Sequence, residues 1–397
     1  MVEGPAAPPL WIDRQADLSA FCQRIEASER IGFDTEFHGE RSYFPHLMLI
    51  QVALPDCVAL IDARADLDLR GFFGRLRDSG ALIVGHALHN DLEIVASVYG
   101  VHFERLFDTQ IAAAFCGYGL QIGLAPLLQG TLSLRLPKGA QLADWSRRPL
   151  PEKQLAYAAN DVLHLEALYQ RLSRRLRDLD RVEWVETECR ALCSPDRYGR
   201  DPAEAWQRIG PARKLPPRDL GVLVALASER DAIAREVDTV PHFLVSDDVL
   251  LTMARHAPTD RDALIGDRRM GNRNLARYAD RWLDAIRRGL ATPVPLPPGR
   301  PPPEPGVEAV AGLLILLVNE IAAREGVASQ LLLKRRQVVE ALQDGCKCDN
   351  GLLDRLGLHG WRLELVGAQV RSLLDGQTQA AVRCADDGSL GLSFVRR

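Results

Sequence analysis

Several features that would place this chain in a specialised class of protein are missing from its sequence. Its eight cysteines are scattered without a framework of pairs, so a disulfide-stapled secreted domain is not indicated and a reduced, cytoplasmic setting is expected. The proline- and alanine-rich start, residues 1–10, has no basic stretch followed by an apolar core, so we expect no signal peptide. No stretch approaches the roughly 20 apolar residues that a membrane span needs.

Motifs for several kinds of chemistry are also missing. No Gly-x-x-x-x-Gly-Lys-Ser/Thr segment occurs, which argues against a P-loop ATP motor. The nine histidines contain no His-x-x-x-His arrangement, and the pair Cys346 and Cys348 lacks zinc-ligand spacing. We therefore interpret the cysteine pair as structural and expect no zinc centre.

Neither sign of charge dominates the chain. It has 49 Lys and Arg against 53 Asp and Glu, for a net charge of −4. A strong basic excess, which by itself would indicate a nucleic-acid partner, is therefore absent, although residues 261–290 are rich in arginine. An acidic total is also what a site built from several carboxylates would produce. Charge alone leaves the partner open.

What is present divides the 397 residues into an α/β part and two helical parts. Apolar runs bounded by Pro- and Asp-containing turns predict strands over 31–37, 47–54, 58–62 and 81–85, and helical spacing predicts helices over 91–99, 108–116 and 152–176. Three consecutive strands followed by mixed elements indicate a layered domain with a mixed sheet. Further on, helices are predicted over 218–238 and 274–290, then a helical block over 307–374 and a strand over 390–395. The segment 292–305 contains eight prolines and is typical of an extended linker.

The most informative feature is a pair of carboxylates inside the first predicted strand. Asp34 and Glu36 lie two residues apart, so both side chains point to the same face of the strand. Two unpaired negative charges buried side by side repel each other and are costly to desolvate. A divalent cation between them removes both problems, so the pair predicts a metal site.

Two further acidic clusters supply candidate ligands, and each has an ordinary structural explanation. Asp91 follows a buried strand and a short turn, where an aspartate commonly caps a helix. Tyr157 and Asp161 are four residues apart and share one helix face, where they are also suited to be hydrogen-bonding partners at the edge of the core. Taken together, four carboxylates and a tyrosine favour a site for hard cations such as Mg²⁺ or Mn²⁺, and two such ions suit in-line phosphoryl transfer.

These residues carry a resemblance to a known family. The segment Asp34-Thr35-Glu36-Phe37, the turn 86–91 and Tyr157-x-x-x-Asp161 occur in the order of the three motifs of the DEDD superfamily of 3′→5′ exonucleases. The tyrosine matches the superfamily's tyrosine-type branch, since the histidine-type branch would have His at position 156, which is Ala. The segments 44–51, 108–117 and 144–150 resemble the bacterial ribonuclease D family more closely still.

The resemblance implies a fold and a mechanism. We expect an α/β exonuclease domain with an RNase H-like mixed sheet over 1–200, a first helicase-and-RNase-D C-terminal (HRDC) domain over 201–291, the linker over 292–305 and a second all-α, HRDC-like domain over 306–397. The implied activity is removal of nucleotides from RNA 3′ ends as 5′-monophosphates, with tRNA precursors as substrate, by a monomeric cytoplasmic enzyme. In this family, Asp34, Glu36 and Asp161 would hold one of two divalent ions and Asp34 with Asp91 the other, while Tyr157 would orient the attacking water.

Residues for binding the substrate are indicated less clearly. Lys138 and Trp145 precede the third motif, where a charge and an aromatic ring would suit phosphate and base, although Trp145 equally suits a packing anchor. Phe37 is a third candidate, beside the first motif. Arg273, Arg277, Arg281 and Arg288 fall at helical spacing and would form a basic stripe, or an exposed face paired with Asp280 and Asp284.

The sequence departs from the ribonuclease D pattern at one segment. Lys138 matches the family's segment, but Leu142 and Ala143 stand where Arg and Thr are usual, so the resemblance implies one phosphate contact fewer than in the family. Two alternatives stay open at this level. The same carboxylates would serve a DNA-directed exonuclease, because nothing in them reads the 2′-hydroxyl. A binding protein with a vestigial nuclease site is disfavoured by the presence of all four carboxylates and the tyrosine.

Overall fold

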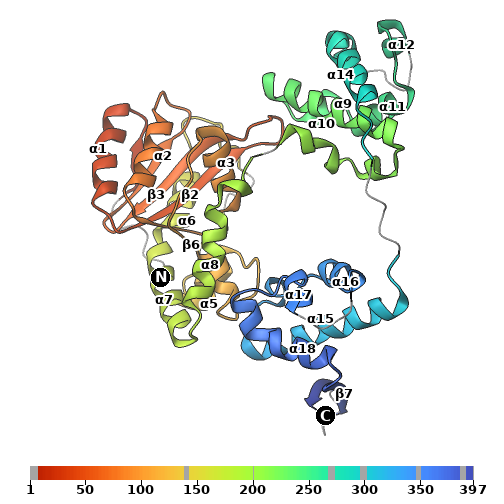
Figure 1. The fold of residues 1–397 in the computed structure, drawn as a ribbon. Helices are drawn as coiled ribbons and strands as arrows, with labels where there is room; N and C mark the ends of the chain where they lie inside the picture. The colour runs from red at the N-terminus through yellow and green to blue at the C-terminus, as the bar shows by residue number, and fades with distance from the viewer. Residues whose placement is uncertain are drawn as a thin grey trace.

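The computed structural model describes residues 8–137, 143–199, 201–266, 273–295, 302–345, 350–384 and 390–396 (Figure 1). An α/β domain comes first along the chain, followed by two helical domains that contact it at separate places. The order α/β, helical, helical is the one predicted from the sequence.

The α/β domain is built on a mixed sheet of six described strands in the order β1-β4-β3-β2-β5-β6. Its strands are β1 (Leu10–Ile12), β2 (Arg30–His38), β3 (His46–Leu54), β4 (Cys57–Asp62), β5 (Leu82–Gly85) and β6 (Leu106–Asp108). β2, β3 and β4 form an antiparallel meander, whereas β1, β5 and β6 pair in parallel with their neighbours. The mixed sheet and the strands at β2 to β5 confirm the prediction, and two short strands are added at its edges.

Helices cover both faces of this sheet. One face packs against α1 (Gln15–Glu26), α2 (Leu69–Asp78) and α3 (His89–Tyr99), around a core that includes Phe33, Phe72 and Phe73. The other face packs against α4 (Thr109–Ala114), α5 (Leu124–Leu132), α6 (Glu152–Leu163), α7 (Leu165–Asp178) and α8 (Val182–Cys193). Gly32 allows α6 to lie close to β2, because a Cβ there would come within 3.2 Å of the Val162 carbonyl oxygen and 3.0 Å of the Ala53 Cβ.

Two helix predictions in this domain need correction. The single helix predicted over 152–176 is interrupted at His164, whose φ and ψ of −101° and 4° leave the helical region, so α6 and α7 are separate helices. The helix predicted to begin at Asp91 begins at His89, with Leu88 at its N-cap. Asp91 lies in the first turn and does not cap the helix, because its side chain accepts a hydrogen bond from Thr35 instead.

The first helical domain follows three short 3₁₀ turns, Pro195–Arg197, Pro202–Arg208 and Gly210–Lys214. Its helices are α9 (Pro217–Glu236), α10 (Pro241–Leu244), α11 (Asp247–His256), α12 (Arg261–Gly266), α13 (Arg273–Arg277) and α14 (Ala279–Ala291). α9 and α14 pack backbone to backbone, since a Cβ on Gly221 would lie 2.4 Å from the Thr292 carbonyl oxygen and one on Gly289 would lie 2.4 Å from the Val222 Cα. The helix predicted over 274–290 is divided between α13 and α14.

The second helical domain consists of α15 (Pro305–Glu325), a 3₁₀ turn (Ser329–Leu331), α16 (Arg335–Gln343), α17 (Asn350–Arg355), a π-helical turn (Leu363–Gly367) and α18 (Ala368–Leu374). The strand predicted near the end is present as β8 (Leu390–Arg396), which pairs with β7 (Thr378–Cys384), a strand the sequence did not indicate. Of the described helices, α15 is long and apolar enough to cross a membrane by length and composition alone. The expectation of no such stretch is therefore corrected. One face of α15, including Leu314, Val318 and Ile321, forms the core of this domain.

A hairpin of the α/β domain reaches into the first helical domain. Tyr43, in the turn between β2 and β3, is buried among the apolar side chains of that domain. Its hydroxyl donates to the Asp231 carboxylate at 2.8 Å and accepts from the Arg235 guanidinium at 3.1 Å. Asp238 accepts from the backbone N–H groups of Tyr43 and Phe44 at 3.0 and 3.1 Å. We call this contact the Tyr43 clamp.

The second helical domain docks through an aromatic cluster. Trp361 stacks on Trp184 of α8 with ring centroids 5.2 Å apart, and it meets Phe115 edge-on at 4.9 Å. Glu188 of α8 accepts hydrogen bonds from the Trp361 indole at 3.0 Å and from the Arg362 guanidinium at 2.7 Å. The dock lies on α4 and α8, whereas the Tyr43 clamp lies at the end of the β2–β3 hairpin.

The clamp gives a first prediction. Tyr43→Phe is expected to lower the free energy of unfolding by about 1–3 kcal/mol, because it leaves the buried Asp231 carboxylate without the phenol that donates to it. Urea unfolding followed by circular dichroism measures the change. The matched control is Tyr99→Phe, which removes a half-buried phenol that has no hydrogen-bond partner among the described residues. A loss in Tyr43→Phe no larger than in Tyr99→Phe would contradict the clamp.

Candidate active site

The first two carboxylates of the predicted site lie on β2, as the alternation of the strand requires. Asp34 pairs across the sheet with Gln51 and Glu36 with Leu49, and the register shifts at a bulge directly after Glu36. Both carboxylates are half-buried, while Thr35 between them is buried. The two side chains therefore emerge on the face that α6 covers.

Asp91 reaches the same region from the first turn of α3. It is buried and accepts a hydrogen bond from the Thr35 hydroxyl. The turn before it is held by Asp108, whose carboxylate accepts from the backbone N–H groups of Ala87 and Leu88 at 3.1 and 2.9 Å while also capping α4. Ala87 has a φ of 60°, a strained value for a residue with a side chain, so Asp108 stabilises a backbone conformation that the site needs.

α6 brings the last two residues of the constellation. Tyr157 and Asp161 share one face of this helix, and the phenol hydrogen-bonds the carboxylate. The interpretation of this pair as hydrogen-bonding partners is therefore correct, and it coexists with a place beside β2. Trp145 packs against Tyr157 with ring centroids 6.1 Å apart and so supports the phenol from behind.

Burial raises the pKa of every carboxyl in the cluster, and repulsion by the other members adds to the rise for Asp34 and Glu36. Burial is the main cause for Asp34, whose pKa lies well above its usual value, with the charges of Asp91, Asp161 and Glu36 adding to it. The pKa of Glu36 is raised to about 8, again by burial and then by Asp161 and Asp91. This mutual influence places the four groups in one electrostatic cluster.

Hydrogen bonds moderate the effect on the other two carboxyls. Burial raises the pKa of Asp91 to about 7 against the opposing hydrogen bond from Thr35, and it raises the pKa of Asp161 to about 7 against that from Tyr157. The pKa of Tyr157 is also raised, by burial and then by the neighbouring carboxylates. The phenol therefore remains protonated at neutral pH and does not act there as a phenolate base.

The cluster fits hard cations by the chemistry of its donors. As the side chains stand, no three Asp, Glu, His or Cys groups among the described residues converge closely enough to ligate one ion. Asp91 is turned towards Thr35 and Asp161 towards Tyr157, as expected of like charges that find separate donors. Gln51, directly opposite Asp34, is fully buried, yet neither its amide oxygen nor its amide nitrogen has a protein partner. A buried amide without a hydrogen-bond partner, close to carboxyl groups whose pKa values are raised, indicates a site that is completed by a ligand.

Three side chains at this site went unnoticed as functional in the sequence. Thr35, Asp108 and Gln51 all lie within segments quoted for the family resemblance, but the roles of Thr35 and Asp108 depend on partners far along the chain, and Gln51 is placed opposite Asp34 only by the pairing of β2 with β3. His86 of the second motif is structural, because its ring bonds the Thr109 hydroxyl and the Ile122 carbonyl oxygen, each at 2.9 Å. A distance in sequence of twenty to sixty residues hides such pairs.

The predicted RNA-binding residues are dispersed. Lys138 and Leu142 lie outside the described residues. Trp145 is 2% exposed, which favours the packing interpretation left open by the sequence. Phe37 is half-buried against the core of the α1–α3 face. Ala143 is half-buried.

The arginine stripe of the first helical domain is only partly available. Arg281 pairs with Glu229 and Glu236 at 2.5 and 2.6 Å, and Arg288 pairs with Glu229 and Asp284 at 2.8 and 2.7 Å. These partners belong mainly to α9, which the sequence did not reveal. Arg273 and Arg277 remain exposed with no ion pair to any described residue.

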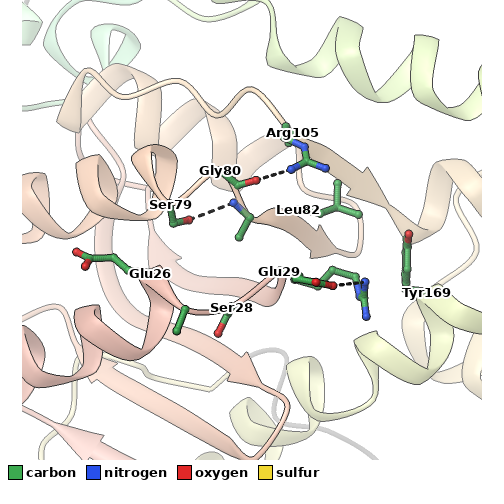
Figure 2. A pocket seen from close by; sticks show the side chains of 11 residues that line it. Glu26, Ser28, Glu29, Ser79, Gly80, Leu82, Arg105 and Tyr169 are labelled. Carbon is green, nitrogen blue, oxygen red and sulfur yellow. Dashed lines mark hydrogen bonds and ion pairs between the residues drawn. The ribbon is translucent and has the colours of Figure 1, made fainter.

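A cavity of about 510 Å³ lies away from the carboxylates, at the start of β2 (Figure 2). Its arginines are engaged by the protein itself. Arg30 pairs with Glu166 at 3.0 Å, and Arg105 donates to the Gly80 carbonyl oxygen at 2.6 Å. The arginines of this cavity are already paired, and its lining has no cluster of carboxyl groups with raised pKa values. It is therefore a weaker candidate for the active site than the carboxylate cluster between β2 and α6.

Comparisons with known proteins agree with this geometry. A family model described as 3′-5′ exonuclease matches residues 9–177, and the HRDC domain model matches residues 219–286. The chain is 35% identical to ribonuclease D of Sphingobium indicum over 386 residues, covering 94% of this chain and 96% of that one. It is 32% identical to ribonuclease D of Bartonella henselae, covering 92% and 90%.

A solved structure extends the likeness to three dimensions. Escherichia coli RNase D, an exoribonuclease involved in structured RNA processing, superposes with a TM-score of 0.79 at 29% identity, covering 93% of this chain and 99% of that one. The likeness therefore includes both helical domains as well as the exonuclease domain.

Proposed function

The chain belongs to the ribonuclease D family of 3′→5′ exoribonucleases, and from this premise we propose that it trims structured RNA precursors, tRNA precursors among them, to their final 3′ ends. As a member of that family it is a hydrolase that removes nucleotides from RNA 3′ ends. The shared identity of its relatives favours RNA over the DNA-directed alternative. The observation that carries the proposal is the cluster of four carboxyl groups with raised pKa values beside Tyr157.

Two divalent cations, Mg²⁺ or Mn²⁺, are the proposed cofactors. Asp34, Glu36 and Asp161 would hold one and Asp34 with Asp91 the other, which makes Asp34 the shared ligand. When bound, the ions would neutralise charge on the phosphate and activate the attacking water. The raised pKa values of these carboxyls support the assignment. Burial and repulsion destabilise the ionised form of each group, and a nearby cation would stabilise that form.

The protein's own groups have distinct roles in this mechanism. The Tyr157 phenol, protonated at neutral pH, would orient the attacking water by hydrogen bonding. Trp145 and Asp161 fix the phenol from two sides, which limits its freedom before substrate arrives. Thr35 and Asp108 hold Asp91 and the turn that carries it. Most of the rate enhancement then comes from positioning and charge neutralisation.

The remaining assignments are part of the same proposal. We place the exonuclease domain at 1–200, a first HRDC domain at 201–291, the linker at 292–305 and a second HRDC-like domain at 306–397. The HRDC match at 219–286 supports the first of the two, and the all-α make-up of α15 to α18 supports the second. We take the enzyme to be a cytoplasmic monomer, in keeping with free thiols at all five cysteines whose state is described.

A direct assay tests the substrate. A tRNA precursor with extra 3′ nucleotides, incubated with enzyme and Mg²⁺ or Mn²⁺, is expected to shorten one nucleotide at a time with release of 5′-mononucleotides, and EDTA is expected to stop the reaction. A 3′-labelled DNA of the same sequence is the control. Equal degradation of DNA, or an intact precursor beside a degraded unstructured RNA, would contradict the proposal.

A further inference from the structure

A second, smaller pocket is lined by cationic side chains that no described residue pairs with. It has a volume of about 340 Å³ and lies between α7, α5 and the turn after α4. The side chains that matter for its chemistry are Tyr118, Thr131, Arg171, Arg174, Arg175 and Asp178. The three arginines and Asp178 are exposed, whereas Tyr118 and Thr131 are half-buried.

None of the three arginines is paired with a described residue. No hydrogen bond or ion pair joins Arg171, Arg174 or Arg175 to a described acceptor, in contrast to Arg30 and Arg105 of the other cavity, which are both engaged. One carboxylate, Asp178, lines the pocket and offsets part of the charge. The balance is three positive groups to one negative, so the pocket attracts anions.

The chemistry of the lining matches a phosphodiester. Arginine presents a planar fork of donors that matches phosphate oxygens, and three such forks surround one pocket here. The Tyr118 phenol also has no hydrogen-bond partner among the described residues, and it adds an aromatic face. Thr131 contributes only its oxygen, since its hydroxyl donates to the Leu127 carbonyl at 2.6 Å. Cations beside an aromatic ring are the usual lining of an RNA groove.

The pocket is separate from the catalytic cluster. Arg30, the first residue of β2, pairs with Glu166 at the start of α7, so α7 runs past the start of the strand whose middle carries Asp34. If α6 and α7 were collinear, Arg171 would lie about 15 Å and Arg175 about 21 Å from Asp161, at about 1.5 Å per residue, and the interruption at His164 makes both values upper bounds. Stacked nucleotides advance by about 3.4 Å each, so the pocket lies at most about four to six stacked nucleotides from the reacting bond.

We propose that this pocket, formed by α7, α5 and the turn after α4, binds backbone phosphate of the RNA substrate at a distance from the 3′ end being cleaved. It contacts the body of a structured RNA while the last nucleotides occupy the carboxylate cluster. The proposal rests on the RNA substrate proposed above and adds where the rest of that substrate is held. Its effect is on affinity for large substrates, and the chemical step is unchanged.

The test compares two substrates with one variant. Arg171→Glu, Arg174→Glu and Arg175→Glu are combined, and steady-state kinetics are measured on an RNA hairpin with a single-stranded 3′ extension and on a trinucleotide. KM for the hairpin is expected to rise about 10- to 100-fold with unchanged kcat, while the trinucleotide, too short to reach the pocket, shows no change. The salt dependence of hairpin binding is expected to fall by about 0.7–0.9 in log–log slope for each phosphate that the variant no longer binds.

The matched control carries the same change of charge elsewhere. Arg14→Glu, Arg70→Glu and Arg77→Glu are combined on exposed positions beside α1 and on α2, across the sheet from α7. An equal rise of KM in the control, an unchanged KM in the pocket variant, or an equal loss on the trinucleotide would each overturn the proposal. If the Glu variant does not fold, the corresponding triple Arg→Gln variant is measured against the same criteria. Turnover of the trinucleotide by the wild type tests the proposed function independently.

Discussion

Asp34→Asn is expected to lower kcat on RNA by about 10³-fold or more and, at the same time, to raise the melting temperature of the metal-free protein. The loss follows from the position of Asp34 as the proposed ligand shared by both ions, whose charge stabilisation amounts to several kcal/mol, each 1.36 kcal/mol being tenfold in rate. The gain follows from repulsion, because Asp34 is half-buried beside three other carboxyls that raise its pKa.

The pH dependence of stability follows from the direction of these shifts. Because the folded-state pKa values are raised, the metal-free fold loses stability over the pH range in which the unfolded chain has ionised and the folded chain has not, and it does not regain that stability at higher pH. Stability is therefore lost as pH rises from about 4, near the usual carboxyl values of 3.8 and 4.5, through the raised pKa values of about 7 for Asp91 and Asp161 and about 8 for Glu36. Asp34→Asn is expected to flatten this fall, because it removes the carboxyl on which the other three charges act.

Differential scanning fluorimetry with EDTA or Mg²⁺ across this pH range provides the measurement. Mg²⁺ is expected to raise the melting temperature of the wild type more than that of Asp34→Asn, and most strongly near pH 8. Asp66→Asn, at an exposed aspartate with no partner among the described residues, is the control and should change neither activity nor stability. Retained activity in Asp34→Asn, or a metal-free variant less stable than the wild type at pH 8, would contradict the assignment.

Arg148→Met is expected to lower the free energy of unfolding by about 3–5 kcal/mol at neutral pH. The guanidinium bonds both oxygens of the largely buried Asp62 carboxylate and the backbone oxygens of Met48 and Trp145. Burial alone would raise the pKa of Asp62, but the hydrogen bonds from Arg148 and the Arg64 backbone outweigh it and hold the pKa below its usual value. Removing Arg148 leaves a buried carboxylate with little compensation.

The pH profile distinguishes this cause from loss of packing. A lowered folded-state pKa contributes stability above the usual value of 3.8, and that stability is lost as pH falls through the folded pKa. The deficit of Arg148→Met should therefore shrink in acid. The double variant Asp62→Asn with Arg148→Met should recover part of the loss, because it removes the uncompensated charge.

Urea unfolding at several pH values measures both effects. Arg75→Met, which breaks the exposed pair with Glu26, is the control and is expected to cost no more than about 1 kcal/mol. A deficit that stays constant from neutral to acid pH would show that lost packing, rather than the charge on Asp62, is responsible. Since Arg148 also holds the backbone of Trp145, which packs on Tyr157, kcat is expected to fall as well.

Local patterns in the sequence predicted those parts of the molecule that local physics determines. The alternation in 31–37 placed Asp34 and Glu36 on one face of β2, and the spacing of four placed Tyr157 and Asp161 on one face of α6. The interruption at His164 was not predicted, because the apolar periodicity continues through it while the backbone changes direction to follow β2 and β5. Periodicity records which residues are buried and not where the helix axis turns.

What the sequence could not reveal are pairings over long distances. Thr35 with Asp91, Asp108 with the Ala87 turn, and Arg281 with Glu229 each join elements whose proximity exists only after folding. The same limit applies to α3, which Asp91 was expected to cap. The Asp91 carboxylate instead accepts a hydrogen bond from the Thr35 hydroxyl on β2, which no local pattern around residue 91 could predict. Residue type predicted the chemistry of the site, and tertiary structure decided which side chains support it.

The Tyr43 clamp has a consequence for how this polypeptide can be divided. The phenol that completes the interior of the first helical domain lies 188 residues before the aspartate that receives its hydrogen bond. A fragment that stops near residue 200 would keep the hairpin and lose its cover, leaving Tyr43, Phe44 and two backbone N–H groups facing water. A helical fragment made alone would have a hole where that ring belongs. A chimera of two relatives joined near residue 200 would therefore combine the β2–β3 hairpin of one protein with the first helical domain of another, and their contact residues need not match. A chimera that takes the hairpin and this helical domain from the same parent should keep its stability best.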